Sequence, residues 1–155
     1  MSVTLFLSAS AYSYDTLFYN TFDLFDSTKL YFGDTISYKL TSDSAFNNLS
    51  LKISSSDSLS SKTVNAHLQP SKYAGKKIYV SAVVKGTLLS HPPLSYNGIK
   101  LMLVIQKKDS SKYYPQAPIG TDLIFDWSQK GFLTVVPEST VSIRLVLGLE
   151  KVSGT

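Results

Sequence analysis

A period of two in the apolar residues is the feature of this 155-residue chain that most limits its fold. In three segments of the second half, every other residue is apolar. The alternating sets are Ile78, Val80, Ala82 and Val84; Ile99, Leu101, Leu103 and Ile105; and Val141, Ile143, Leu145, Leu147 and Leu149. Because successive side chains of a strand point to opposite faces of a sheet, this period of two predicts half-buried β-strands.

Less regular segments predict the remaining strands, and turn residues separate them. We expect strands at residues 3–8, 17–25, 35–40, 49–54, 63–69 and 131–136. Turn signals such as Gln69-Pro70, Asn97-Gly98 and the stretch 115–120 lie between the expected strands. Eight or nine short strands without an amphipathic helix predict an all-β fold, an antiparallel β-sandwich of the jelly-roll kind. The length fits a single domain over residues 1–155.

Composition removes several classes of function. Without cysteine there can be no disulfide, thiolate metal site or cysteine nucleophile. The net charge of +4 comes from scattered lysines with one arginine, whereas nucleic-acid binders concentrate their positive charge and favour arginine. No apolar run is long enough to span a membrane, and no basic segment precedes the apolar start as in a signal peptide. Nucleic acid and a membrane span are therefore not expected.

Two stretches resemble the jelly-roll carbohydrate-binding modules appended to bacterial glycoside hydrolases. The first contains Ser50-Leu-Lys-Ile53 and Tyr79-Val-Ser-Ala-Val-Val-Lys85, and the second contains Phe125-Asp-Trp127 and Phe132-Leu-Thr-Val-Val-Pro137 before a long apolar strand. The resemblance covers roughly residues 46–155. The first 45 residues lack the family's usual opening, and the sequence stops at Thr155, where the family continues into a last strand.

The resemblance implies a non-catalytic module that binds a polysaccharide or oligosaccharide and needs no cofactor. It also implies an extracellular or surface-associated protein, with a larger parent enzyme as its protein partner. A homo-oligomer is the other protein partner that we consider. His67 and His91 are the only histidines and have no ligand spacing around them, so a zinc site is not expected, and the sequence leaves a structural calcium open.

Sugar binding requires an aromatic ring to stack on the sugar and planar polar groups to reach its hydroxyls. The stacking candidates are Trp127, Tyr113 and Tyr114, and the hydrogen-bonding candidates are Asn65, His67, Gln69, Gln106 and Arg144. We expect Asn65, His67 and Gln69 on one face of their strand, opposite Val64, Ala66 and Leu68, which point into the sandwich. Gln106 and Arg144 also alternate with the inward apolar residues of their own strands, so we expect them on outward faces. Alternatively, Trp127 packs in the core and the polar row simply faces solvent.

Two other classes of function remain open. A structural subunit of a virion, pilus or surface assembly would explain the many aromatic residues between Tyr12 and Phe25, which an interface could bury. An enzyme is the third class, because Asp122 with Asp126, or Asp23 with Asp26, could form the carboxylate pair that glycoside hydrolysis requires.

The strand missing from the family pattern would leave an unpaired sheet edge, which proteins normally cover. Residues 3–8 have a composition that suits a strand. We therefore expect them to lie in a sheet, with pairing inside the same chain favoured over donation to a neighbouring copy.

Overall fold

The structure is a computed structural model that describes residues 2–4, 31–32, 37–42, 50–88, 90–119 and 124–155. Its elements are almost all strands. In chain order they are β1 (Ser2–Thr4), β2 (Tyr31–Phe32), β3 (Ser37–Thr41), β4 (Ser50–Ser54), β5 (Ser61–Leu68), α1 (Pro70–Tyr73), β6 (Lys77–Thr87), β7 (Gly98–Lys107), β8 (Lys112–Tyr113), β9 (Ile124–Val135) and β10 (Thr140–Glu150).

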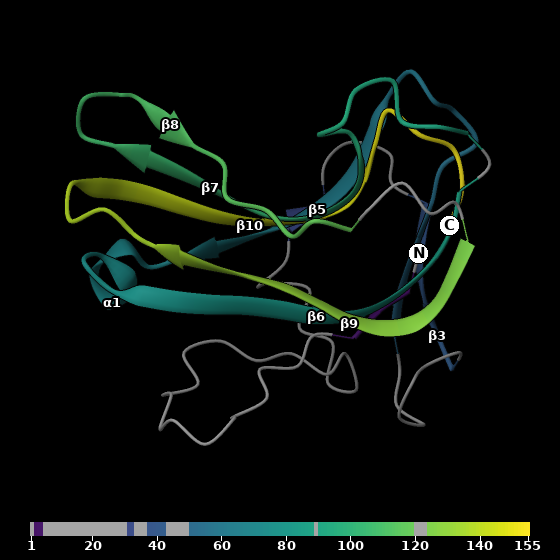
Figure 1. The fold of residues 1–155 in the computed structure, drawn as a ribbon, viewed down its shortest axis with the longest axis horizontal. Coiled ribbons are helices and arrows are strands. Elements are labelled where there is room, and N and C mark those ends of the chain that lie inside the picture. The colour runs from purple at the N-terminus through teal and green to yellow at the C-terminus, as the bar shows by residue number, and fades with distance from the viewer. Residues whose placement is uncertain (1, 5–30, 33–36, 43–49, 89, 120–123) are drawn as a thin grey trace.

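The strands form two antiparallel five-stranded sheets. Sheet I has the order β3-β4-β1-β6-β9, and sheet II has the order β2-β5-β10-β7-β8. Figure 1 shows them as two layers, with β5, β10 and β7 in the upper layer and β6 and β9 in the lower one. The chain crosses between the layers repeatedly from β4 to β10, so the expected all-β sandwich is confirmed.

Alternate residues of both sheets fill the space between the layers. The alternating sets around Ala82, Leu101 and Leu145 supply much of the core, and Val64 and Ala66 are also buried, with Leu68 packed against them. Each fully buried leucine or isoleucine contributes about 1.5–3 kcal/mol relative to an exposed one. The predicted inward faces of these strands are therefore confirmed.

Val141 is the exception, because it is exposed although its parity matches the apolar residues that follow it. The pairing of β10 with β7 shifts register between Thr140 and Ser142. Such an irregularity inserts an extra residue and changes the face on which it lies. The prediction that Val141 belongs to the inward set was wrong for this reason.

Some elements differ from the expected ones. β9 begins at Ile124 rather than at residue 131, because its register with β6 shifts between Val84 and Gly86 and interrupts the alternation. α1 occupies the turn expected at Gln69-Pro70, with proline in the first turn, where its missing N–H costs no hydrogen bond. The strand expected at residues 17–25 lies outside the described residues.

The described N-terminal strand lies inside sheet I. β1 pairs with β4 through Ser2 and Lys52 and with β6 through Ser2 and Lys85. The same gap between these strands receives the end of the chain, where Gly154 bridges Ser55 and Leu88. Pairing within the chain is confirmed for residues 3 and 4, in a central position instead of at an edge. Residues 5–8 lie outside the described residues.

Gly148 in β10 allows the close approach of β5. Its φ is +145°, and a Cβ there would lie 2.2 Å from the carbonyl oxygen of Lys62 and 2.8 Å from the Cα of Thr63. We expect Gly148→Ala to lower the free energy of unfolding by about 2–4 kcal/mol, since backbone strain and a backbone clash add. Urea denaturation followed by circular dichroism measures the loss.

Gly75→Ala is the matched control. Gly75 also has a positive φ, +77°, but a Cβ there would meet only the flexible side chain of Glu138, at 3.3 Å. We expect a loss of about 1–2 kcal/mol from the backbone conformation alone. Equal losses for the two variants would contradict the role assigned to the β5–β10 contact.

Candidate functional site

The outer surface of sheet II gathers most of the polar candidates. We call this surface the polar face, and the register of the strands defines it. Its members are Thr63, Asn65 and His67 of β5; Ser142, Arg144 and Val146 of β10; Met102, Val104 and Gln106 of β7; and Lys112, Tyr114 and Gln116 of the segment that begins with β8. In Figure 1 the chain rises above sheet II at both ends, at the β7–β8 hairpin on one side and before β5 and β7 on the other.

One row crosses the middle of the polar face. Arg144 lies directly opposite His67 on β5 and opposite Val104 on β7. The pairs Ile105–Tyr113 and Met102–Gln116 place Tyr114 opposite Val104, where its side chain is 53% exposed. An imidazole, a guanidinium and an exposed phenol ring therefore lie in line across four neighbouring segments.

The neighbouring rows continue this mixture of polar and apolar groups. Val146 of β10 lies between Asn65 of β5 and Met102 of β7. Met102 in turn lies opposite Gln116. Gln106 lies between Ser142 and Lys112. Half-buried or buried apolar side chains thus form the centre of the face, flanked by amides and charges. Gln69 is exposed and follows β5 beyond its last pair with β10.

A buried lysine ties the polar face to its surroundings. The side chain of Lys100 is 4% exposed, and its Nζ lies 2.8 Å from Oε2 of Glu150. The ammonium also donates to Oε1 of Gln116 at 3.0 Å and to the carbonyl oxygen of Tyr96. Asn97 donates to the same carboxylate oxygen of Glu150 at 3.0 Å. These bonds hold the 96–97 turn and Gln116 against the sheet.

Opposing effects act on the Glu150 carboxyl. Burial by itself raises its pKa, but the hydrogen bonds from Lys100 and Asn97, together with the positive charges of Lys100 and Lys151, outweigh burial, and the pKa is lowered from the usual range. The carboxylate therefore stays charged at neutral pH and keeps the buried ammonium paired.

The sequence alone did not predict this network, although a signal for it was present. Lys100 and Glu150 both have the outward parity of their strands. Opposite charges on one face of two paired strands can meet, but the pairing of β7 with β10 had to be known first.

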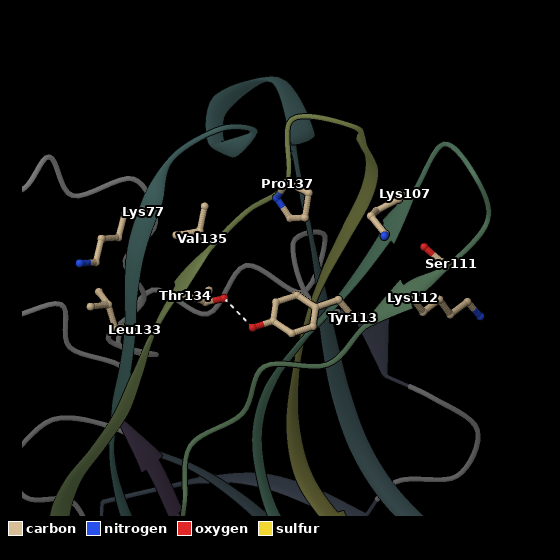
Figure 2. Close-up of a pocket in the computed structure, with 9 residues that line it drawn as sticks. All are labelled: Lys77, Lys107, Ser111, Lys112, Tyr113, Leu133, Thr134, Val135 and Pro137. Atoms are coloured by element: carbon tan, nitrogen blue, oxygen red, sulfur yellow. Dashed lines mark hydrogen bonds between the residues drawn. The ribbon is translucent and has the colours of Figure 1, made fainter.

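Trp127 and Tyr113 do not lie on the polar face. Trp127 belongs to β9 in sheet I, beside the register shift opposite Lys85. Tyr113 lies opposite the buried Ile105, so its side chain turns toward the other sheet, where its hydroxyl accepts a hydrogen bond from Thr134 Oγ1 at 3.4 Å. Figure 2 shows this ring spanning the gap between the edges of the two sheets.

The Tyr113 ring lines a cavity of about 640 Å³, which we call the edge pocket. Its lining residues are Lys77, Lys107, Ser111, Lys112, Tyr113, Leu133, Thr134, Val135 and Pro137. In Figure 2 the Lys77 and Lys112 side chains extend away from the ring on opposite flanks. Lys107 lies 3.8 Å from Asp109, whose carboxylate also accepts the Ser111 hydroxyl, so part of the positive charge is compensated.

The described residues offer little for catalysis or metal binding. No group of three histidine or acidic side chains among them could hold a metal ion. Asp126 is exposed and lies 3.9 Å from Lys85, while Asp23, Asp26 and Asp122 lie outside the described residues. In the same described ranges no helix is long and apolar enough to cross a membrane.

Comparison with solved structures identifies the class of fold. The C-terminal family 22 carbohydrate binding module of Clostridium thermocellum Xyn10B matches with a TM-score of 0.58 and 13% identity, over 83% of this chain and 80% of that module. A family 22 xylan-binding domain gives 0.60 and 13% over 83% and 82%, and the CBM22-2 xylan-binding domain of Paenibacillus barcinonensis Xyn10C gives 0.55 and 17% over 83% and 81%.

The chain therefore has the β-sandwich fold of carbohydrate-binding modules. No protein-family model matches the sequence, and no curated protein matches it significantly. At this level of identity the likeness concerns the fold alone.

The Lys100–Glu150 pair predicts a pH-dependent contribution to stability. A lowered carboxyl pKa stabilises the fold above the unfolded pKa, and this stabilisation is lost as the pH falls through the folded value. We expect Glu150→Gln to cost about 1–3 kcal/mol at pH 7, since it leaves Lys100 without its counter-ion. Urea unfolding at pH 7 and pH 3 should show the difference from wild type shrinking at pH 3.

Glu138→Gln serves as the control, because Glu138 is exposed. Its unfolding free energy should stay within about 0.5 kcal/mol of wild type at both pH values. A Glu150→Gln difference that is the same at pH 7 and pH 3 would contradict the ionic role of Glu150.

Proposed function

We propose that this protein is a non-catalytic module that binds a polysaccharide on the polar face of sheet II. The observation that carries the proposal is the row of His67, Arg144, Val104 and Tyr114 across the sheet. The fold shared with xylan-binding domains supports a plant-type polysaccharide such as xylan as the first ligand to test.

The chemistry of the polar face fits a sugar chain. An exposed tyrosine offers a ring on which the apolar face of a pyranose can stack. Asn65, Gln106 and Gln116 supply planar amides, which can donate hydrogen bonds to sugar hydroxyls and accept hydrogen bonds from them. Neighbouring residues within a row are one strand spacing apart, about 4.8 Å, so one extended ligand can touch several strands at once. Polar and apolar contacts are thus available together, as carbohydrate recognition requires.

The acidic side chains of the polar face support binding without catalysis. Glycoside hydrolysis in most families uses two carboxyl groups about 5–10 Å apart. Among the described residues, Glu150 has the outward parity of sheet II, and its carboxylate is held by Lys100 and Asn97. A carboxylate fixed in this way is a structural group, and the described part of the face provides no second one.

The proposal includes an extracellular or surface-associated location, attached to or beside an enzyme that degrades the polysaccharide. The alternative of an assembly subunit relied on the aromatic residues between Tyr12 and Phe25, which lie outside the described residues. The described residues contribute no observation in its favour.

Isothermal titration with soluble xylans, β-glucans and mannans tests the function. We expect binding to at least one of these polymers and a loss of tenfold or more in affinity for Tyr114→Ala, because burying a large ring against the ligand contributes about 1.5–3 kcal/mol. Absence of heat with every polymer would contradict the proposal.

Tyr79→Ala is the matched control for the aromatic substitution. Tyr79 is 39% exposed, but it belongs to β6 and has the outward parity of sheet I. Its loss should leave the dissociation constant within about twofold of wild type. If Tyr79→Ala abolished binding while Tyr114→Ala did not, the site would have to be moved to sheet I.

A further inference from the structure

The charges of the polar face point to the kind of polysaccharide that fits it. Arg144 is the only arginine in the sequence, and it occupies the central row of the face. A guanidinium remains fully charged at any physiological pH and presents a planar fork that matches a carboxylate. A neutral sugar can satisfy a guanidinium with hydroxyls, but a carboxylate does so with charge as well.

Arg144 is not engaged in a described ion pair. The ion pairs among the described residues join Lys85 to Asp126, Lys100 to Glu150 and Lys107 to Asp109. Arg144 is also exposed, so its head group can reach a ligand that lies on the face. Its charge is therefore available to a bound molecule.

The acidic group on this side of sheet II does not oppose that charge. The Glu150 carboxylate is 2.8 Å from the buried Lys100 ammonium and also accepts a hydrogen bond from Asn97. This pair is neutral as a unit. Lys112, opposite Gln106 at the edge of the sheet, adds a second exposed cation to the face. The described polar face consequently carries a positive charge.

The positive charge continues around the edge of the sandwich. Lys112 also lines the edge pocket with Lys77 and Lys107, and none of the described residues that line this pocket is acidic. The nearby Asp109 compensates part of the Lys107 charge. A ligand that approaches sheet II from β8 thus meets cations first, which favours association with a polyanion.

We propose that the ligand is an acidic polysaccharide, one whose sugars carry carboxylates, as uronic acids do. This inference rests on the proposed function and specifies its substrate class. Arg144 binds the carboxylate, and Tyr114 stacks on the sugar ring. Their Cα atoms are two strand spacings apart, about 10 Å. A sugar ring with its carboxylate, together with the long arginine side chain, spans that distance.

Matched pairs of ligands test the inference. Glucuronic-acid-substituted xylo-oligosaccharides are compared with unsubstituted ones of the same backbone length, and oligogalacturonate with neutral galacto-oligosaccharides, by isothermal titration at 20 mM and 500 mM NaCl. We expect an acidic ligand to bind at least tenfold more tightly than its neutral counterpart at low salt. Most of this advantage should vanish at high salt, because ions screen exposed charges.

Substitutions test whether Arg144 causes the preference for the acidic ligand. Arg144→Gln should remove most of the preference for the acidic ligand, while Arg144→Lys should keep part of it because the charge remains and the planar fork is lost. Lys151→Gln is the control, since Lys151 is exposed and follows the far end of β10 from the edge pocket. It removes the same charge from the protein and should leave the preference within twofold.

The outcomes separate the two proposals. Equal affinity for acidic and neutral ligands, or a preference that Arg144→Gln leaves intact, would overturn the inference and leave polysaccharide binding in place. Failure of both members of both pairs and of the neutral polymers would overturn the proposed function and the inference together.

Discussion

The antiparallel pairing of β10 with β5 on one side and β7 on the other is the constraint on which the core and the polar face both depend. One register points Leu145 and Leu147 into the sandwich and Arg144 and Val146 away from it. A slip by one residue would exchange the two sets, burying a guanidinium and exposing leucines. The apolar core therefore fixes the register, and the register in turn aligns Arg144 with His67. The candidate binding residues owe their alignment to the packing beneath them.

The Lys100–Glu150 pair is the second element of this arrangement, and it works against the usual preference for apolar interiors. Burying an ammonium is costly, and a paired carboxylate with additional hydrogen bonds offsets that cost without necessarily adding stability. The pair fixes the positions of nearby segments, because the Lys100 ammonium joins the 96–97 turn, Gln116 and the end of β10. The same pairing neutralises Glu150, which leaves Arg144 to determine the sign of the charge at the middle of the polar face.

The sequence predicted the sandwich and the parity of its long strands because burial imposes a period of two on β6, β7 and β10. It also placed Asn65, His67, Gln106 and Arg144 on outward faces, and the pairing of β5, β10 and β7 brings them to one surface. The sequence did not predict the order of the strands, because which strands are neighbours depends on contacts between residues far apart in the chain. For this reason the sequence could not show that Trp127 and Tyr113, which suit stacking by residue type, lie away from the polar face. Val141 and the start of β9 were misjudged where register shifts break the alternation.

Mapping of a bound oligosaccharide by NMR tests the central claim most directly, namely that the outer surface of sheet II binds a glycan. Backbone amide signals are followed during titration with whichever acidic or neutral oligosaccharide gives heat in calorimetry. We expect the largest shifts around His67, Arg144 and Tyr114, with little change around Tyr79 and Leu133 on sheet I. Shifts concentrated on sheet I, with the signals of His67 and Arg144 unmoved at saturation, would contradict the claim.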